Sequence, residues 1–540
     1  MEVGVTGEEA PAVASSPGQT SSSGAAHELR TLTVREAVCV GAGVVLADLA
    51  LYRGHGYSGV AAMVVGAMVL LWIGKRRSSQ QWHYRWVVAA LLTASALKLL
   101  WEGSVPLAIF ALFLVSALVV ALEGRAPYVL ETLTSLLKAV PAALTALVFH
   151  RHAMTAHVPT DTSRGGWLGI VLPALVVAIF GAIFVMANPD LADLVWRNGR
   201  LAWTRLSSAF QVFSIGEVLF WLCVGAVMLG LLQPLHERFW KVGWTATAMP
   251  VVTAPSDGEI VAYRNSLIAA ITLFAAYLVF EFCTLWFREF PAGFYYAGYA
   301  HQGAAWLTVA LALTSVMLSV VFRASSAHAD RLNRLRPLAW IWSIENLLLA
   351  AAVYNRLWIY VQYNGMTRMR MVGLLGITAV VVGLLLMLRR LAHGHGFFWL
   401  VQRYAWTVAL AILTYLLLPV DVLVHSYNVR RAVSGDLPPV VQVVAHPIDS
   451  GGVLVLSALL ESQNPIVRDG IRAMLAERQL TVRNDVQQQQ RLGWTAFQLS
   501  DDRLKQHLNR LEPHWSELLD EPVRRQQLVD RFREYAMQWY

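Results

Sequence analysis

The sequence has 540 residues, of which 56% are hydrophobic and only 14% are charged, and its mean hydropathy is +0.49. A soluble chain carries roughly 25% charged residues, so this one has too few charges to cover a soluble surface. The net charge of +8 is small enough to come from asymmetry between loops, and it gives no reason to expect a nucleic-acid partner. All three cysteines fall inside apolar runs, which argues against a disulfide framework. The composition therefore predicts a polytopic membrane protein whose main partner is the lipid bilayer.

Residues 1–30 are rich in Ser, Gly, Ala, Pro and Glu and contain no apolar segment, so they are expected to form a disordered cytoplasmic tail. One crossing of the bilayer core takes about 20 apolar residues. Eleven runs meet this requirement, at about 36–52, 58–74, 85–101, 105–122, 166–186, 209–232, 263–287, 304–322, 337–361, 371–390 and 399–425. The predicted fold is an all-α bundle of about eleven spans over residues 31–430.

The stretch 129–150 is ambiguous because it combines apolar residues with Glu131, Lys138 and Pro141. It is interpreted as an interfacial helix that does not cross. With this assignment, one side of the membrane carries more than twice as many loop Lys and Arg residues as the other. The positive-inside rule then places the N-terminus in the cytoplasm and the C-terminus outside it, in a cell inner membrane.

Residues 431–540 have the charge density of a soluble protein and apolar residues at helical spacing. Asn464 followed by Pro465 is a good helix start, because Asn caps a helix and Pro is tolerated in its first turn. The pattern predicts a small extramembrane helical domain, which is expected to lie outside the cytoplasm and to contact a protein partner.

Ionisable residues inside the spans are costly and need a reason to be there. The candidates are Glu217, Glu281, Glu345, Arg356 and Asp421. Glu345 and Arg356 share one helix face but lie about 16 Å apart along the axis, so each needs a partner on another helix, and Glu281 or Asp421 could serve Arg356. These groups either line a polar cavity for an ion or solute or form structural pairs between helices.

Motifs for catalysis and metal binding are weak. His150, His152 and His157 have metal-like spacing, as do His393 and His395, but neither group has a Cys or carboxylate close by. We therefore expect no metal site and no cofactor. No catalytic residue can be named, and an enzymatic role is not favoured.

Five short strings together carry a family resemblance. They are Ala187-Asn188-Pro189-Asp190, Tyr299-Ala300-His301-Gln302-Gly303, Tyr363 to Arg370, His425 to Arg431, and Trp494 to Ser500. This set resembles a family of bacterial multi-pass membrane proteins known only as a domain of unknown function, over roughly residues 166–540. The resemblance implies a membrane architecture and no agreed activity.

The first four strings are separated by pairs of crossings, so they are expected on one face of the membrane, the extracytoplasmic one. The polar residues of this predicted face are Asn188, Asp190, Tyr299, His301, Thr367, Arg370, Asn428 and Arg431. Each could equally cap a helix or fix a loop.

Three functions stay open at the level of the sequence. The first is a transporter or sensor of a small polar or ionic solute that uses the intramembrane acids. The second is a non-catalytic scaffold or sensory partner that acts through the extracytoplasmic face. The third is a membrane enzyme on a lipid or envelope precursor, with His301, Asp190 and Arg370 as its polar groups.

Overall fold

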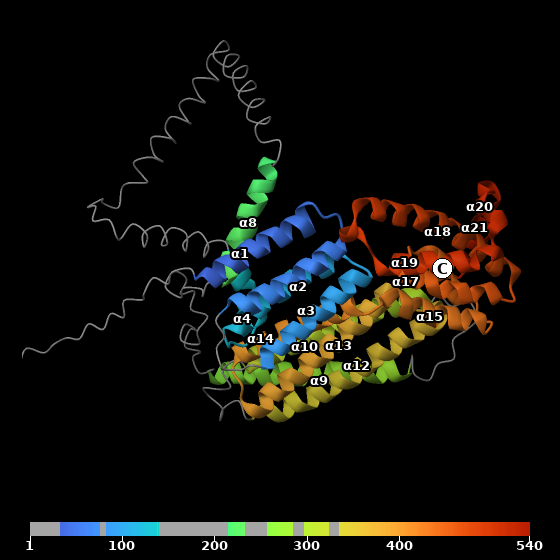
Figure 1. Ribbon diagram of the computed structural model, residues 1–540. Helices are drawn as coiled ribbons and strands as arrows, with labels where there is room; N and C mark the ends of the chain where they lie inside the picture. Colours follow the sequence, from blue (N-terminus) through green and yellow to red (C-terminus); the bar gives the residue numbers. More distant parts are fainter. Residues whose placement is uncertain are drawn as a thin grey trace, which may run out of the picture.

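The computed structural model describes residues 33–75, 83–137, 139, 214–232, 256–283, 296–322 and 334–539 (Figure 1). The predicted tail 1–30, the predicted span 166–186 and the residues Asn188 and Asp190 lie outside this part. All regular structure in the described residues is helical, as the composition predicts. Eight of the described helices are long and apolar enough to cross a membrane. The chain is therefore an all-α, multi-pass membrane protein.

One part of the bundle is formed by the N-terminal helices and α8. Its helices are α1 (Val34–Ala47), the π-helix η1 (Asp48–Tyr52), α2 (Tyr57–Gly74), α3 (His83–Trp101), α4 (Val105–Leu122) and α8 (Ile215–Leu232). Helix α4 carries no charged residue and is the most buried of the candidate spans, as expected for a helix that is apolar on all sides. Leu92, Leu99, Leu114 and Leu118 fill the core of this part.

The second part of the bundle contains the longest helices. They are α9 (Asp257–Glu281), α10 (Tyr296–Val321), α12 (Arg336–Asn364), α13 (Arg368–His393) and α14 (Phe397–Leu417). Helix α14 joins the two parts, because Leu400 belongs to the core of the second and Leu413 to the core of the first. The two parts therefore form one continuous bundle.

Local sequence signals set several helix ends. Thr33 and Ser256 each begin a helix with a capping box, and Thr367 caps α13 by accepting the backbone N–H of Arg370. Gly365 ends α12 at a φ of 80°, where a glycine is favoured. The predicted last span, 399–425, is wrong at its end: α14 stops at Leu417, before Pro419, whose ring cannot continue a helix.

The predicted span 36–52 corresponds to α1 and η1, and the ambiguous stretch 129–150 is helical over residues 129–137. The other residues of that stretch lie outside the described part, apart from Ala139, which is also helical. Whether it crosses the membrane stays a prediction.

The C-terminal helices form a compact domain at one end of the bundle (Figure 1). They are α15 (Val420–Val433), η4 (Pro438–Val440), α16 (Val441–Ala445), α17 (Ser450–Leu456), η5 (Ser457–Glu461), α18 (Pro465–Leu492), η6 (Trp494–Ala496), α19 (Leu499–Leu511), η7 (Glu512–His514), α20 (Ser516–Leu519) and α21 (Pro522–Met537). Asn464 caps α18, as expected. The core surrounds Trp515 and Phe532, both fully buried, and it reaches back to Val429 of α15.

Candidate functional site

Arg356 of α12 forms a buried ion pair with Glu281 of α9, one of the two partners that the sequence suggested. Its Nε and Nη2 atoms each lie 2.5 Å from a different carboxylate oxygen, and Glu281 is fully buried. The hydroxyl of Tyr277 donates to the same carboxylate at 2.9 Å. A two-point Arg–carboxylate contact satisfies both charges, so this pair ties two spans together.

Glu217 of α8 belongs to a different network. Its carboxylate lies 2.6 Å from Nη2 of Arg53, whose Nε lies 2.9 Å from Asp48. The indole N–H of Trp221 donates to Asp48 at 2.8 Å. This network joins α8 to the π-helix η1 and has no member in common with the Arg356 pair.

The remaining intramembrane candidates also stand apart. Glu345 lies three helical turns from Arg356, and its Oε2 atom is buried with no hydrogen-bond partner among the described residues. Both oxygens of Asp421 are bonded by Arg368, and one of them accepts the backbone N–H of Asp449 at 2.8 Å. Three of the five predicted groups thus pair with three different arginines rather than meeting at one point.

Four residues of the predicted polar face lie together where the α12–α13 turn meets α15 of the C-terminal domain. Asn428 accepts the backbone N–H of Met366 at 2.7 Å and donates to its carbonyl at 2.8 Å. Arg370 donates to the Gly365 carbonyl and stacks on a tyrosine ring, and Arg431 pairs with Asp436. With Thr367 capping α13, these residues hold the α12–α13 turn against α15.

The face as predicted also included Tyr299 and His301. Their backbone lies in α10, and their side chains lie outside the described part. Its two other members, Asn188 and Asp190, fall among the residues not described. A shared function for the whole face stays a prediction.

The C-terminal domain also contacts the N-terminal part of the bundle, through residues 494–498, here called the docking segment. Gln498 accepts the backbone N–H of Gly103 at 2.6 Å and donates to the Leu99 carbonyl at 3.2 Å. The Thr495 hydroxyl accepts the backbone N–H of His55 at 3.1 Å. The loops that precede α2 and α4 are thus both bonded to the same short segment of the domain.

Glycines make this close approach possible. A Cβ on Gly56 would lie 2.8 Å from the Cα of Ala496 and from the carbonyl oxygen of Thr495, and one on Gly59 would lie 3.2 Å from the Cβ of Thr495. Sequence reasoning missed Gly54-His55-Gly56-Tyr57-Ser58-Gly59, although its Gly-x-Gly-x-x-Gly spacing is visible in the sequence. It follows a helix rather than a strand, and the docking segment packs against it, so it lacks the context of a dinucleotide-binding loop.

Beside the docking segment, a cavity of about 480 Å³ opens between the domain and the ends of α2 and α3. Its wall combines residues 55–57, 102 and 103 with others from α17, α18, α19 and the short segments that adjoin these helices. The ionisable residues of the wall are His55, Glu102, Asp449, Arg478, Asp485 and Asp501. Four carboxyl groups against one guanidinium give the cavity an acidic character. No group of metal-ligating side chains is assembled in the described residues.

The electrostatics of the cavity centre on Asp449. Burial, together with the nearby carboxylate of Glu102, raises the pKa of Asp449 from its ordinary 3.8 to about 7. Burial also acts to raise the pKa of the neighbouring Asp421, but the Arg368 guanidinium outweighs it and holds that pKa below its usual value. Burial lowers the pKa of His425 to about 4, so this imidazole is neutral near pH 7. Of Asp421, His425 and Asp449, only Asp449 has a pKa near neutral pH.

Other polar contacts order the cavity wall. The Ser450 hydroxyl donates to Asp501 at 2.5 Å and accepts from Arg478 at 3.1 Å, and Gln489 donates to Asp501 at 2.7 Å. Glu102 pairs with Lys98 at 3.0 Å, within α3 and the loop that follows it. The wall is therefore preorganised, which lowers the entropic cost of binding a ligand.

The fold defines a multi-pass α-helical membrane protein with a helical domain docked on one end of its bundle. Residues 60–442, more than half of the chain, match the family described as "Domain of unknown function (DUF4153)", and the chain belongs to this family. The match begins earlier and ends earlier than the region 166–540 over which the sequence resembled such a family. The match covers α2 almost entirely and then α3 to α15, whereas α1 and η1 precede it and α17 to α21 lie beyond it. Neither the curated proteins nor the solved structures contain a match to the chain.

Proposed function

We propose that this membrane protein senses a small cationic solute, such as an amine, which binds in the cavity between the bundle and the C-terminal domain. The observation that supports the proposal is the cavity itself, with four carboxyl groups and one arginine in its wall. Small-ligand sites are commonly concave and lie where structural units meet. In the proposed orientation the protein spans a bacterial inner membrane, and its C-terminal domain lies outside the cytoplasm.

A cationic ligand fits the charge of this cavity better than an anionic one. Ionising Asp449 is unfavourable because it is half-buried and close to Glu102. An ammonium group next to these carboxylates would favour the ionised form of Asp449. Amine binding should therefore strengthen as the pH rises through about 7, the pKa of Asp449.

Sensing fits the location of the cavity better than transport does. Glu217, Glu281 and Asp421 pair with separate arginines, so the described residues offer no common intramembrane site. A ligand between two packed units stabilises the arrangement that forms its site. Binding would thus shift the domain toward its docked position, and a protein partner on the domain would detect the change.

The enzymatic alternative has less support. Arg370, its proposed anion-binding group, is buried, donates to the Gly365 carbonyl and stacks on the ring of Tyr360. A guanidinium engaged in this way fixes a turn and is poorly placed to bind a substrate.

The test is calorimetric titration of the full-length protein in nanodiscs with putrescine and ethanolamine as cations, and with succinate as the anion. We expect the amines to bind and succinate not to bind. Asp485→Asn removes one charge from the cavity wall and should weaken amine binding about fivefold. Glu477→Gln, an exposed position on the same helix, is the matched control and should leave binding unchanged. Absence of amine binding, or equal affinities of the two variants, would contradict the proposal.

A further inference from the structure

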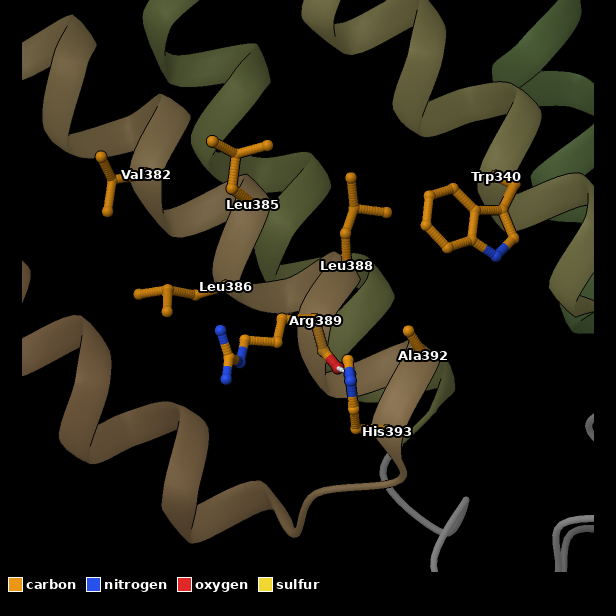
Figure 2. Close-up of a pocket in the computed structure, with 8 residues that line it drawn as sticks. All are labelled: Trp340, Val382, Leu385, Leu386, Leu388, Arg389, Ala392 and His393. Carbon is orange, nitrogen blue, oxygen red and sulfur yellow. Dashed lines mark hydrogen bonds between the residues drawn. The ribbon is translucent and has the colours of Figure 1, made fainter.

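A second cavity, of about 390 Å³, lies on the surface of the membrane-spanning bundle between α12 and α13. Unlike the cavity beside the docking segment, it is mainly apolar. Its wall is mainly aliphatic and aromatic, with Leu385 and Leu386 of α13 and Trp340 of α12 (Figure 2). Leu385 is 47% exposed and Trp340 is 42% exposed. The groove is thus an open apolar surface of a helix pair that faces lipid.

One end of this groove is basic. Residues 382, 385, 386, 389 and 393 of α13 recur at helical spacing, so the apolar stripe continues directly into Arg389 and His393. Figure 2 shows both side chains at the end of the stripe, in the last two turns of the helix. Among the described residues, no carboxylate pairs with the guanidinium of Arg389. Arg389 is also exposed, so a ligand can reach its charge.

The surroundings of this end are typical of a membrane interface. The rings of His393 and His395 are stacked, with their centroids 5.8 Å apart. The ring of His395 also stacks on Trp399, at 4.3 Å between centroids. The guanidinium of Arg403 lies 5.5 Å from the centre of the Trp399 ring. Tryptophan is enriched at the level of lipid headgroups, and basic residues there attract anionic lipids.

We propose that the groove between α12 and α13 binds one anionic phospholipid, with an acyl chain along Leu385 and Trp340 and the phosphate on Arg389. The apolar stripe accounts for the chain, and Arg389, which no carboxylate of the described residues pairs with, accounts for the negative headgroup. An electroneutral lipid would fill the groove equally well but would bind more weakly, because its headgroup has no net charge to attract Arg389. A soluble phosphate would bind Arg389 but would not contact the apolar stripe.

The test is native mass spectrometry of the full-length protein in detergent, titrated with phosphatidylglycerol or phosphatidylcholine of the same chain length. We expect phosphatidylglycerol to bind more tightly, and Arg389→Gln to weaken its binding about fivefold. Arg389→Lys should retain most of the binding, because it keeps the charge. The matched control is Arg264→Gln, at an exposed arginine of α9, which should have no effect.

Leu385→Asn leaves the charge in place and should weaken the binding of both lipids. Equal binding of the two lipids, or equal effects of Arg389→Gln and Arg264→Gln, would overturn the proposal. Full competition by glycerol 3-phosphate, which has no acyl chain, would also overturn it, since the site would then be one for a soluble anion.

Discussion

The contact between the docking segment and the loop before α2 is sensitive to a single methyl group. In Gly56→Ala, the added Cβ would lie 2.8 Å from the Cα of Ala496 and from the carbonyl oxygen of Thr495. Both are backbone atoms, so no side-chain rotation can relieve the overlap. The backbone of Gly56 is extended, with φ at 179°, a conformation that alanine also adopts. The expected effect is therefore steric and not conformational.

The size of the effect follows from the overlap. Carbon atoms in favourable contact lie about 3.5–4.0 Å apart, so the segment must move outward to admit the methyl group. Overpacking by a methyl group costs about 1–3 kcal/mol. That cost lowers the ratio of docked to undocked segment between about fivefold and about a hundredfold.

Hydrogen exchange of the full-length protein in nanodiscs measures this ratio directly. The backbone N–H groups of Gly103 and His55 donate to Gln498 and Thr495 of the docking segment, so both exchange faster when the segment leaves. We expect both amides to exchange at least fivefold faster in Gly56→Ala. The control is Gly41→Ala in α1, where an added Cβ meets nothing within 4 Å. Unchanged exchange in Gly56→Ala would refute the steric reasoning.

Three further predictions concern the titrating carboxyl group and two buried contacts. Because the pKa of Asp449 is raised to about 7, its stabilising contribution is complete below pH 3.8 and is lost as the pH rises through 7. Asp449→Asn, which keeps the oxygen that caps α17, should reduce the fall in melting temperature between pH 4 and pH 8; an unchanged fall would contradict this. Glu281→Met should destabilise the bundle by about 3–5 kcal/mol in thermal unfolding. The double variant Glu281→Met with Arg356→Met should recover most of this lost stability. A double variant no more stable than the single one would argue against a structural pair. Trp515→Phe leaves the Gln479 oxygen without its indole donor, at a cost of about 1–3 kcal/mol measured by chemical unfolding; unchanged stability would show that this bond is dispensable.

The fold class was predictable because lipid imposes a strong pattern on sequence. Backbone groups in a bilayer must be satisfied within each segment, so long apolar runs become helices. The start of α18 was equally clear, since Asn464 and Pro465 are local signals. The end of the last span was not, because the residues after Pro419 remain partly apolar and pack into the C-terminal core instead of the bundle.

The cavity between the bundle and the C-terminal domain could not be predicted, because its wall combines segments more than three hundred residues apart. Nothing in the sequence places Glu102 near Asp449, or Gly56 near Ala496. Long-range charge pairing was only partly predictable: a partner for Arg356 was required by its burial, and Glu281 was one of two choices. The bonding of Asp421 to Arg368 depends on the break at Pro419, which moves the acid out of the last span.

A cation bound in the cavity between the bundle and the C-terminal domain should stabilise the docked domain. The most direct test is hydrogen exchange of the Gly103 amide in nanodiscs, with and without saturating ethanolamine, at pH 8, where Asp449 is mostly ionised. We expect slower exchange with the amine in the wild-type protein and a smaller effect in Asp485→Asn. Ethanolamine that binds without changing the exchange of Gly103 would contradict the claim.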